Sequence, residues 1–556
     1  SYARSAQSLR RGDRPLRRPF PQLSRRTPVA LFAAACLLAA AGAVAAPAVV
    51  ELTIAELRAG LASGSLSCRA VVQAHLDRIA AYDDATGLHA VTEVNPEALA
   101  EAAALDAHLA RGRAVGRLAC VPLLVKDNFD TVGLPTTAGS SALAGSVAPD
   151  DAFMVRRLRA EGAIVVAKTN MAEWAFSPRQ TVSSSYGTTA NAYALDHVPA
   201  GSSGGTASGV AASFGLAGLG SDTGNSIRGP SSHLALFGIR STLGLTSRDG
   251  VVPLVFDRDV AGPMTRTVAD GALLLDVIAG TDPADPYTAA ADARREADYT
   301  ARLRADGLVG ARIGVLRALA PADDTDPEIL ELFEAALDDL ERAGATIVDA
   351  VEIPRLAAHL EADYFCNRFR FDLANYLRTL DAPPFLDVRE VLARGEHVPG
   401  NEGALEFFSG GPLDVHPAEA EPPCPDFADH PGRQAFLADV TAAMDAAGVA
   451  ALAYPGWRWP PAALDRGNED YRGDNSQLLA PATGMPALNV PMGYTREGRL
   501  PAGLQLLGRR WEDGRLIQYA YAYEQATEHR RPPATFPGAA RRALRALRFA
   551  EGSPFR

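Results

Sequence analysis

Two serines and one lysine stand where the chain could assemble a nucleophile and its base. Ser202 lies in the glycine-rich run AGSSGG, Ser226 lies in the run GSDTGNSIRGP, and Lys126 follows the apolar run VPLLV. A serine hydroxyl becomes a nucleophile when a base takes its proton, and neither glycine-rich run contains a histidine. Lys126 can supply that base if burial keeps its amine neutral. Arginine cannot, because its guanidinium stays protonated.

The basic residues of the chain are almost all arginine. Of the 54 lysines and arginines in 556 residues, two are lysine, Lys126 and Lys168. A GC-rich coding sequence would explain the arginine excess and would make both lysines accidental. The alternative is that Lys126 persists because a deprotonatable amine is needed there, whereas a structural role near the site is favoured for Lys168.

The spacing of the glycine-rich runs allows their serines to meet. A helix over residues 206–213 would advance roughly 12 Å, and an extended return over 215–220 would recover roughly 16 Å. Ser202 and Ser226 can therefore face each other.

Strand-like and helical segments alternate around these runs. Apolar runs at 118–125 and 163–167 enclose a helical stretch at 152–161, and the same pattern returns between 313 and 351 around a helix from Pro327 to Arg342. Helices are also expected over 52–82, with Thr53 as a cap, and over 96–111, and strands with a final helix between 450 and 525. The pattern predicts an α/β fold: one large domain with a central mixed β-sheet flanked by helices on both faces.

Residues 355–430 depart from this pattern. They are irregular and rich in proline, glycine and aromatics, as expected of a variable substrate lobe. The expected pocket walls combine this lobe with two earlier segments, and the residues concerned are Met171, Trp174, Tyr186, Tyr364, Phe365 and Phe369. An apolar or aromatic acyl group would suit such walls.

The first 45 residues differ from the rest in charge. Residues 1–26 carry eight arginines and one aspartate, and an uncharged run follows to Ala45. A basic start, a short apolar run and the small-x-small site Ala43-Val44-Ala45 predict a signal peptide cleaved before Ala46, with an uncleaved anchor as the alternative. The mature chain, 46–556, would then be secreted or periplasmic, with no stable membrane span.

Charge and cysteine content narrow the partners. The whole chain has a net charge of -12, and removing residues 1–45 leaves -19, so nucleic acid is not an expected partner. Four cysteines remain in the mature chain, Cys68, Cys120, Cys366 and Cys424, in no metal-binding pattern. One disulfide is possible but not required.

The ordered motifs resemble the amidase signature family, serine hydrolases with a Ser-Ser-Lys triad. AGSSGG, GSDTGNSIRGP and GIRSTLG match its core over about residues 118–270, and VKDN, AKTNMAE, AGPMTRTVAD, TGMPALNVPMG and GLQLLG match further elements. The resemblance implies that Ser226 is the acyl-accepting nucleophile. Ser202 is then the bridging serine, normally after a cis peptide bond, and Lys126 the base.

The same resemblance assigns supporting groups around Ser226. It implies an oxyanion hole formed by the backbone N–H groups of Thr223, Gly224, Asn225 and Ser226. Asp222 and Arg228 are expected to pair and hold this loop. Asn225 replaces the usual glycine, and asparagine tolerates positive φ well enough to keep the loop's shape. Arg240 replaces the family's lysine, which suggests that its position needs only a cation.

Other functions compete with this interpretation. GSSGG also fits the nucleophile elbow of α/β-hydrolases, in which Ser203 would attack with His397 or His529 as base. Further alternatives are a non-catalytic binding protein and a component of an amidotransferase that works on aminoacyl-tRNA.

The function expected is hydrolysis of the C–N bond of a small linear carboxamide, without metal or organic cofactor, by a monomer or homodimer. An aryl acylamide, carbamate or ester substrate on the same triad is the main alternative. The sequence does not choose among aryl, peptide, fatty and carbamate substrates.

Overall fold

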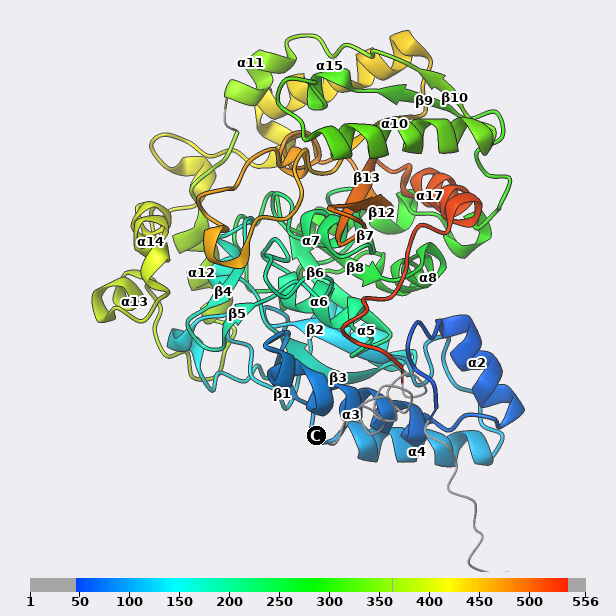
Figure 1. Ribbon diagram of the computed structural model, residues 1–556. Helices are drawn as coiled ribbons and strands as arrows, with labels where there is room; N and C mark the ends of the chain where they lie inside the picture. The colour runs from blue at the N-terminus through cyan, green and yellow to red at the C-terminus, as the bar shows by residue number, and fades with distance from the viewer. Residues whose placement is uncertain (1–46, 363, 539–556) are drawn as a thin grey trace, which may run out of the picture. The chain divides into compact units, whose positions relative to one another are not determined.

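An eleven-stranded mixed sheet organises the computed structural model, which describes residues 47–362 and 364–538 (Figure 1). The strand order is β1-β3-β2-β6-β8-β7-β12-β13-β11-β9-β10. Strand β2 is parallel to β3 and β6, and β9 is parallel to β10 and β11, whereas the remaining pairs are antiparallel. The predicted signal segment, 1–45, lies outside the described residues.

The strands of the sheet are short and mostly buried. Their bounds are β1 Val91–Val94, β2 Pro122–Lys126, β3 Ile164–Thr169, β6 Ala217–Asp222, β7 Phe237–Arg240, β8 Val260–Thr265, β9 Arg312–Val315, β10 Thr346–Val348, β11 Ala451–Pro455, β12 Ala487–Thr495 and β13 Leu500–Gly508. Strands β4 (Thr181–Ser183) and β5 (Gly187–Thr189) form a separate hairpin. Every residue of β2, β3 and β6 is buried, which explains why these strands read as continuous apolar or small-residue runs.

Helices cover both faces of the sheet, as predicted. One group contains α6 and α7, which contact each other and the central strands, and another contains α8, α10 and α17, which also contact those strands. The helix bounds are α2 Ile54–Ser63, α3 Cys68–Thr86, α4 Ala98–Ala110, α5 Phe153–Ala160, α6 Gly204–Ala211, α7 Arg228–His233, α8 Val268–Ile278, α9 Ala291–Arg294, α10 Pro327–Arg342, α11 Leu356–Glu361, α12 Phe369–Leu377, α13 Arg389–Arg394, α14 Glu402–Ser409, α15 Pro431–Ala447, α16 Ala480–Thr483 and α17 Asp513–Thr527. The predicted α/β class with a mixed sheet is confirmed.

One predicted helix is wrong in its extent. The expected helix over 52–82 is two helices, α2 and α3, because α2 ends at Gly64, whose φ of 71° is left-handed. The predicted cap is confirmed, since Thr53 and Glu56 form a reciprocal capping box at the start of α2. Helix α10 has the predicted bounds.

The irregular segment 355–430 folds as short helices around its own apolar cluster. Helices α12, α13 and α14 lie together at the left of Figure 1, in yellow-green. Their buried side chains, Phe369, Leu373 and Leu405 among them, pack in one cluster with Met171 and Trp174 from the segment after β3. The lobe is thus anchored to the signature core. Within the described residues, no helix is both long enough and apolar enough to cross a membrane.

Candidate active site

Lys126 ends β2 in the interior of the sheet. Its side chain is fully buried, and its Nζ lies 2.8 Å from Ser202 Oγ and 2.8 Å from Ser221 Oγ. Burial lowers the pKa of the Lys126 amine to about 7, although the carboxylates of Asp222 and Asp259 oppose that shift. The amine can therefore exist in its neutral, proton-accepting form near neutral pH.

Ser202 precedes α6, and the Gly201–Ser202 peptide bond is cis, as the family resemblance implied. Gly201 has no room for a side chain, since a Cβ there would collide with the carbonyl oxygens of Ser177 and Gln180. The Ser202 carbonyl accepts a hydrogen bond from Ala172 N–H at 3.0 Å. These contacts hold Ser202 against the end of β2.

Asp222, at the end of β6, anchors the loop that carries Ser226. Its carboxylate accepts from Arg228 Nε and Nη2, each at 3.1 Å, and from Arg240 Nη1 at 3.0 Å, and all three side chains are buried. Burial by itself would raise the pKa of Asp222, but Arg228 and Arg240 lower it to about 2. The predicted Asp222–Arg228 pair is confirmed, and Arg240 supplies the cation expected at its position.

Residues 223–226, which follow β6, present free backbone donors. In the described part of the chain, none of the N–H groups of Thr223, Gly224, Asn225 and Ser226 donates a hydrogen bond. Gln477 lies directly against this loop, and a Cβ at Gly224 would displace the end of its side chain. Asn225 does not have positive φ, so the loop accepts asparagine for a different reason from the one expected: no left-handed residue is required.

Ser226 lines a cavity of about 90 Å³. Its side chain is almost buried, and its Oγ donates to Asn225 Oδ1 at 3.4 Å. Among the described residues, no hydrogen bond joins Ser226 to Ser202. The structure thus places Lys126 in contact with Ser202 and leaves Ser226 facing the cavity.

The rest of the lining of this cavity is mostly apolar. It consists of Ala175, Phe176, Pro178, Leu254, Arg258, Phe365, Phe408 and Gln477. Phe176 and Phe408 stack with ring centroids 4.5 Å apart, and Phe365 meets Phe408 edge-on at 5.7 Å. Phe176 and Phe408 were not predicted from the sequence; the aromatic pair Phe407-Phe408 within the lobe was the available signal.

The expected pocket wall needs correction, because of its six residues only Phe365 lines the cavity. Met171, Trp174 and Phe369 are buried one layer behind it, where Phe369 packs against Phe176 at 5.1 Å. Tyr364 instead hydrogen-bonds His359 at 2.7 Å and packs on Phe436. Tyr186 does not line the cavity either. Aromatic side chains at helical spacing have here formed a core rather than a binding surface.

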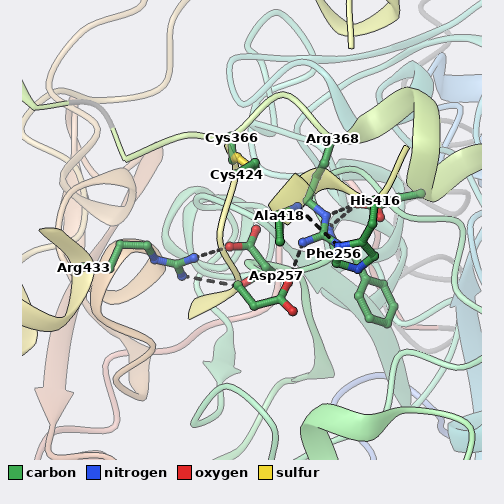
Figure 2. Close-up of a disulfide and its surroundings, with 10 residues drawn as sticks. Phe256, Asp257, Cys366, Arg368, His416, Ala418, Cys424 and Arg433 are labelled. Carbon is green, nitrogen blue, oxygen red and sulfur yellow. Dashed lines mark hydrogen bonds and ion pairs between the residues drawn. A yellow bond between two sulfur atoms is a disulfide. The ribbon is translucent and has the colours of Figure 1, made fainter. Parts of the chain in front are cut away.

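A disulfide holds the lobe beside Phe365. Cys366 and Cys424 are bonded, and Figure 2 shows this bridge near Arg368 and Asp257. Arg368 pairs with Asp372 at 2.7 Å and with Asp426 at 2.9 Å. A second disulfide joins Cys68 in α3 to Cys120, just before β2. The described residues therefore contain two bridges, where the sequence allowed one and required none.

The second lysine has a structural role, as expected. Lys168 Nζ donates to Phe129 O at 2.7 Å, Pro135 O at 3.0 Å and Thr136 Oγ1 at 3.0 Å, and lies 3.7 Å from Asp127. It ties the loop after β2 to β3.

The nucleophile-elbow alternative is not assembled. Ser203 is buried and donates to Ser221 O at 3.2 Å. His397 contacts the Val398 carbonyl and His529 contacts Asp339, and within the described residues neither contacts Ser203. In the part of the chain that the structure describes, no group of three or more His, Cys, Asp or Glu side chains is placed to hold a metal ion.

Comparisons with known proteins identify the family. The amidase family model matches residues 70–402. A glutamyl-tRNA(Gln) amidotransferase subunit from Gloeobacter violaceus is 35% identical over 500 residues, covering 87% of this chain and 98% of that protein. The chain belongs to the amidase family.

Solved structures of amidases share the fold. The native peptide amidase from Stenotrophomonas maltophilia superposes with a TM-score of 0.79 at 37% identity, over 88% of this chain and 99% of that one. A bacterial aryl acylamidase of the amidase signature family gives 0.71 at 25% identity, over 91% and 100%. The protein is thus an amidase-family enzyme for amide C–N bonds.

Proposed function

We propose that this amidase hydrolyses a linear carboxamide through an acyl-enzyme on Ser226. Ser202 bridges Ser226 to Lys126, which acts as the base. The observation that carries the proposal is the 2.8 Å contact between Lys126 Nζ and Ser202 Oγ, made by a buried amine whose pKa burial lowers to about 7.

The reaction follows from these positions. Ser226 Oγ attacks the substrate carbonyl carbon as its proton passes to Ser202, whose own proton passes to Lys126. The carbonyl oxygen becomes negative and is stabilised by free N–H groups of residues 223–226. The ammonium of Lys126 returns a proton through Ser202 to the substrate nitrogen, the C–N bond breaks, and the amine leaves. Water then attacks the Ser226 ester by the same proton route, releasing the acid.

The proposed substrate class is supported by the other residues that line the Ser226 cavity. Phe176, Leu254, Phe365 and Phe408 offer ring faces and aliphatic surface, and Arg258 and Gln477 are polar. Such a lining favours an apolar or aromatic group on the acyl side of the amide, as in the C-terminal amide of a peptide with an apolar last residue. Esters and carbamates of the same shape are the alternative substrates for the same three catalytic residues.

A second candidate is the role named by several relatives, that of one component of a glutamyl-tRNA(Gln) amidotransferase. We favour a stand-alone, exported amidase because the chain carries two disulfides, which form and persist in oxidising compartments. The acidic mature chain is also a poor surface for tRNA. A stand-alone enzyme should hydrolyse amides without any partner protein.

The test uses three serine variants and a panel of amide, anilide, ester and carbamate substrates. Ser226→Ala should abolish turnover and labelling by a fluorophosphonate probe, and Ser202→Ala should reduce kcat by about 10²–10⁴-fold, as loss of a proton-transfer group does. Ser203→Ala is the matched control and should leave both within about twofold of the wild type, because Ser203 only donates to a backbone carbonyl. Loss of labelling in Ser203→Ala alone would overturn the assignment.

A further inference from the structure

The side chain of Asn225 lies between the proposed nucleophile and a buried carboxylate. Its Nδ2 donates to Asp474 Oδ2 at 2.9 Å and to Pro178 O at 3.3 Å, while its Oδ1 accepts from Ser226 Oγ at 3.4 Å. Glycine is usual at this position in the amidase signature family. Because glycine has no side chain, these contacts are not part of the family's common loop.

Two acceptors fix which end of the carboxamide faces Ser226. Turning the amide over would place Oδ1 against the Asp474 carboxylate and the Pro178 carbonyl, both of which are acceptors. In the observed orientation, Nδ2 donates to both acceptors and Oδ1 faces the Ser226 hydroxyl.

Asp474 is itself held in place. Tyr471 OH donates to its Oδ2 at 3.0 Å and Ser476 N–H donates to its Oδ1 at 3.1 Å. On the other side, a Cβ at Gly229 would lie 2.7 Å from Asn225 Nδ2, so α7 presses closely on the amide. The carboxamide is therefore confined between α7 and residues 471–476.

We propose that Asn225 is a positioning residue: its carboxamide, oriented by Asp474, selects the rotamer from which Ser226 attacks. The inference rests on the proposed function. A serine hydroxyl has three staggered positions about its Cα–Cβ bond, and an acceptor beside one of them favours that one. A serine hydroxyl has one proton, and in the resting enzyme it points to Asn225 Oδ1. When substrate binds, this proton turns about the Cβ–Oγ bond toward Ser202, while the oxygen stays in the χ1 position that Asn225 has selected; Asn225 itself takes no proton.

The test uses two variants. Asn225→Gly introduces the glycine that is usual in the family, and Asp474→Asn removes the charge of the carboxylate that orients the Asn225 amide. Assays at about pH 8.5 keep Lys126 neutral and Asp474 ionised, because burial moves the pKa of each to about 7. We expect Asn225→Gly to lower kcat and the rate of fluorophosphonate labelling of Ser226 about fivefold, the size of one uncharged hydrogen bond, with KM within twofold.

The double variant Asn225→Gly/Asp474→Asn and the variant Tyr471→Phe test whether both residues act through the Asn225 amide. Asp474→Asn should lower kcat less, and the double variant should match Asn225→Gly, since both changes act through one amide. Tyr471→Phe removes one of the two hydrogen bonds that hold Asp474, so its kcat should lie between those of the wild type and Asp474→Asn. A folded Asn225→Gly enzyme with the wild-type kcat and labelling rate, or one changed only in KM, would overturn the proposal. Absence of labelling in the wild type would instead refute the acyl-enzyme on Ser226.

Discussion

The two walls of the Ser226 cavity are built by different forces. On one side, the loop 222–228 is fixed by a buried carboxylate between two buried guanidiniums. On the other, the lobe presents Phe365 and Phe408, which are held by ring packing and by a neighbouring disulfide.

This difference determines which amino-acid substitutions each side of the cavity tolerates. Ion pairs and hydrogen bonds have directions, and removing one partner of a buried pair costs about 3–5 kcal/mol, so few substitutions are tolerated around Asp222. Apolar packing is not directional, and ring or aliphatic side chains of similar volume can replace one another. We therefore expect that substitutions confined to the lobe would change the acyl specificity and leave the chemistry intact.

The largest effect expected lies on the charged side. Lys126→Arg should lower kcat at least about 1,000-fold, because the positive charge is kept but the proton-accepting amine is lost. Lys168→Arg is the matched control: its contacts are two backbone carbonyls, a threonine hydroxyl and Asp127, so it should retain activity and show mainly a changed melting temperature. More than a tenth of wild-type kcat in Lys126→Arg would contradict the role of the amine.

A pH profile tests the same residue without mutation. In the proposed mechanism the active form has a neutral Lys126, and the pKa of this amine is lowered, chiefly by burial, to about 7. Hence kcat/KM should rise about tenfold per pH unit below that value and level off above it, a change of about 50-fold between pH 5 and 7 and about 100-fold between pH 5 and the plateau. Residual activity of Lys126→Ala should not follow this curve. A midpoint near 10 would mean that the amine is not desolvated in solution.

The residues of the polar side of the site could be predicted from the sequence, whereas those of the lobe could not. Lys126, Ser202, Ser226 and the Asp222–Arg228 pair were found because fixed residue types at fixed spacing are needed there, and the structure brings Lys126 to Ser202 and Asp222 to Arg228. The Ser226–Ser202 contact remains a prediction. Strands β2 and β6 were expected because they are continuous apolar or small-residue runs.

The lobe was predicted poorly for a physical reason. Trp174 and Phe369 are aromatic, as is Phe365, and composition does not tell which ring faces solvent. That depends on how residues 355–430 pack on the segment after β3, a contact between parts of the chain about 200 residues apart. Asp474 and Gln477 reach the loop from even farther along the chain and left no local signal.

The two disulfides sharpen the comparison by separating stability from binding. Cys68–Cys120 joins α3 to the start of β2 in the core, so changing both to serine should lower the free energy of unfolding by about 2–5 kcal/mol and spare KM. Changing both Cys366 and Cys424 to serine should instead raise KM for aromatic acyl amides up to about tenfold, because Phe365 adjoins the bridge. Denaturant unfolding and steady-state kinetics on both variants measure this. Equal KM changes would show that the lobe bridge does not shape the wall.

The smallest effect expected comes from one ring of the lobe. Phe365→Ala removes apolar surface from the cavity wall, so KM for an aromatic acyl amide should rise about fivefold, the loss of roughly 1 kcal/mol of burial, while acetamide hydrolysis and kcat stay unchanged. Phe407→Ala is the matched control, because Phe407 is 57% exposed and does not line the cavity. The same KM rise in both variants would trace it to loosening of the lobe. A fall in kcat for acetamide would mean that the lobe wall also takes part in the chemistry, and the separation between the two walls would fail.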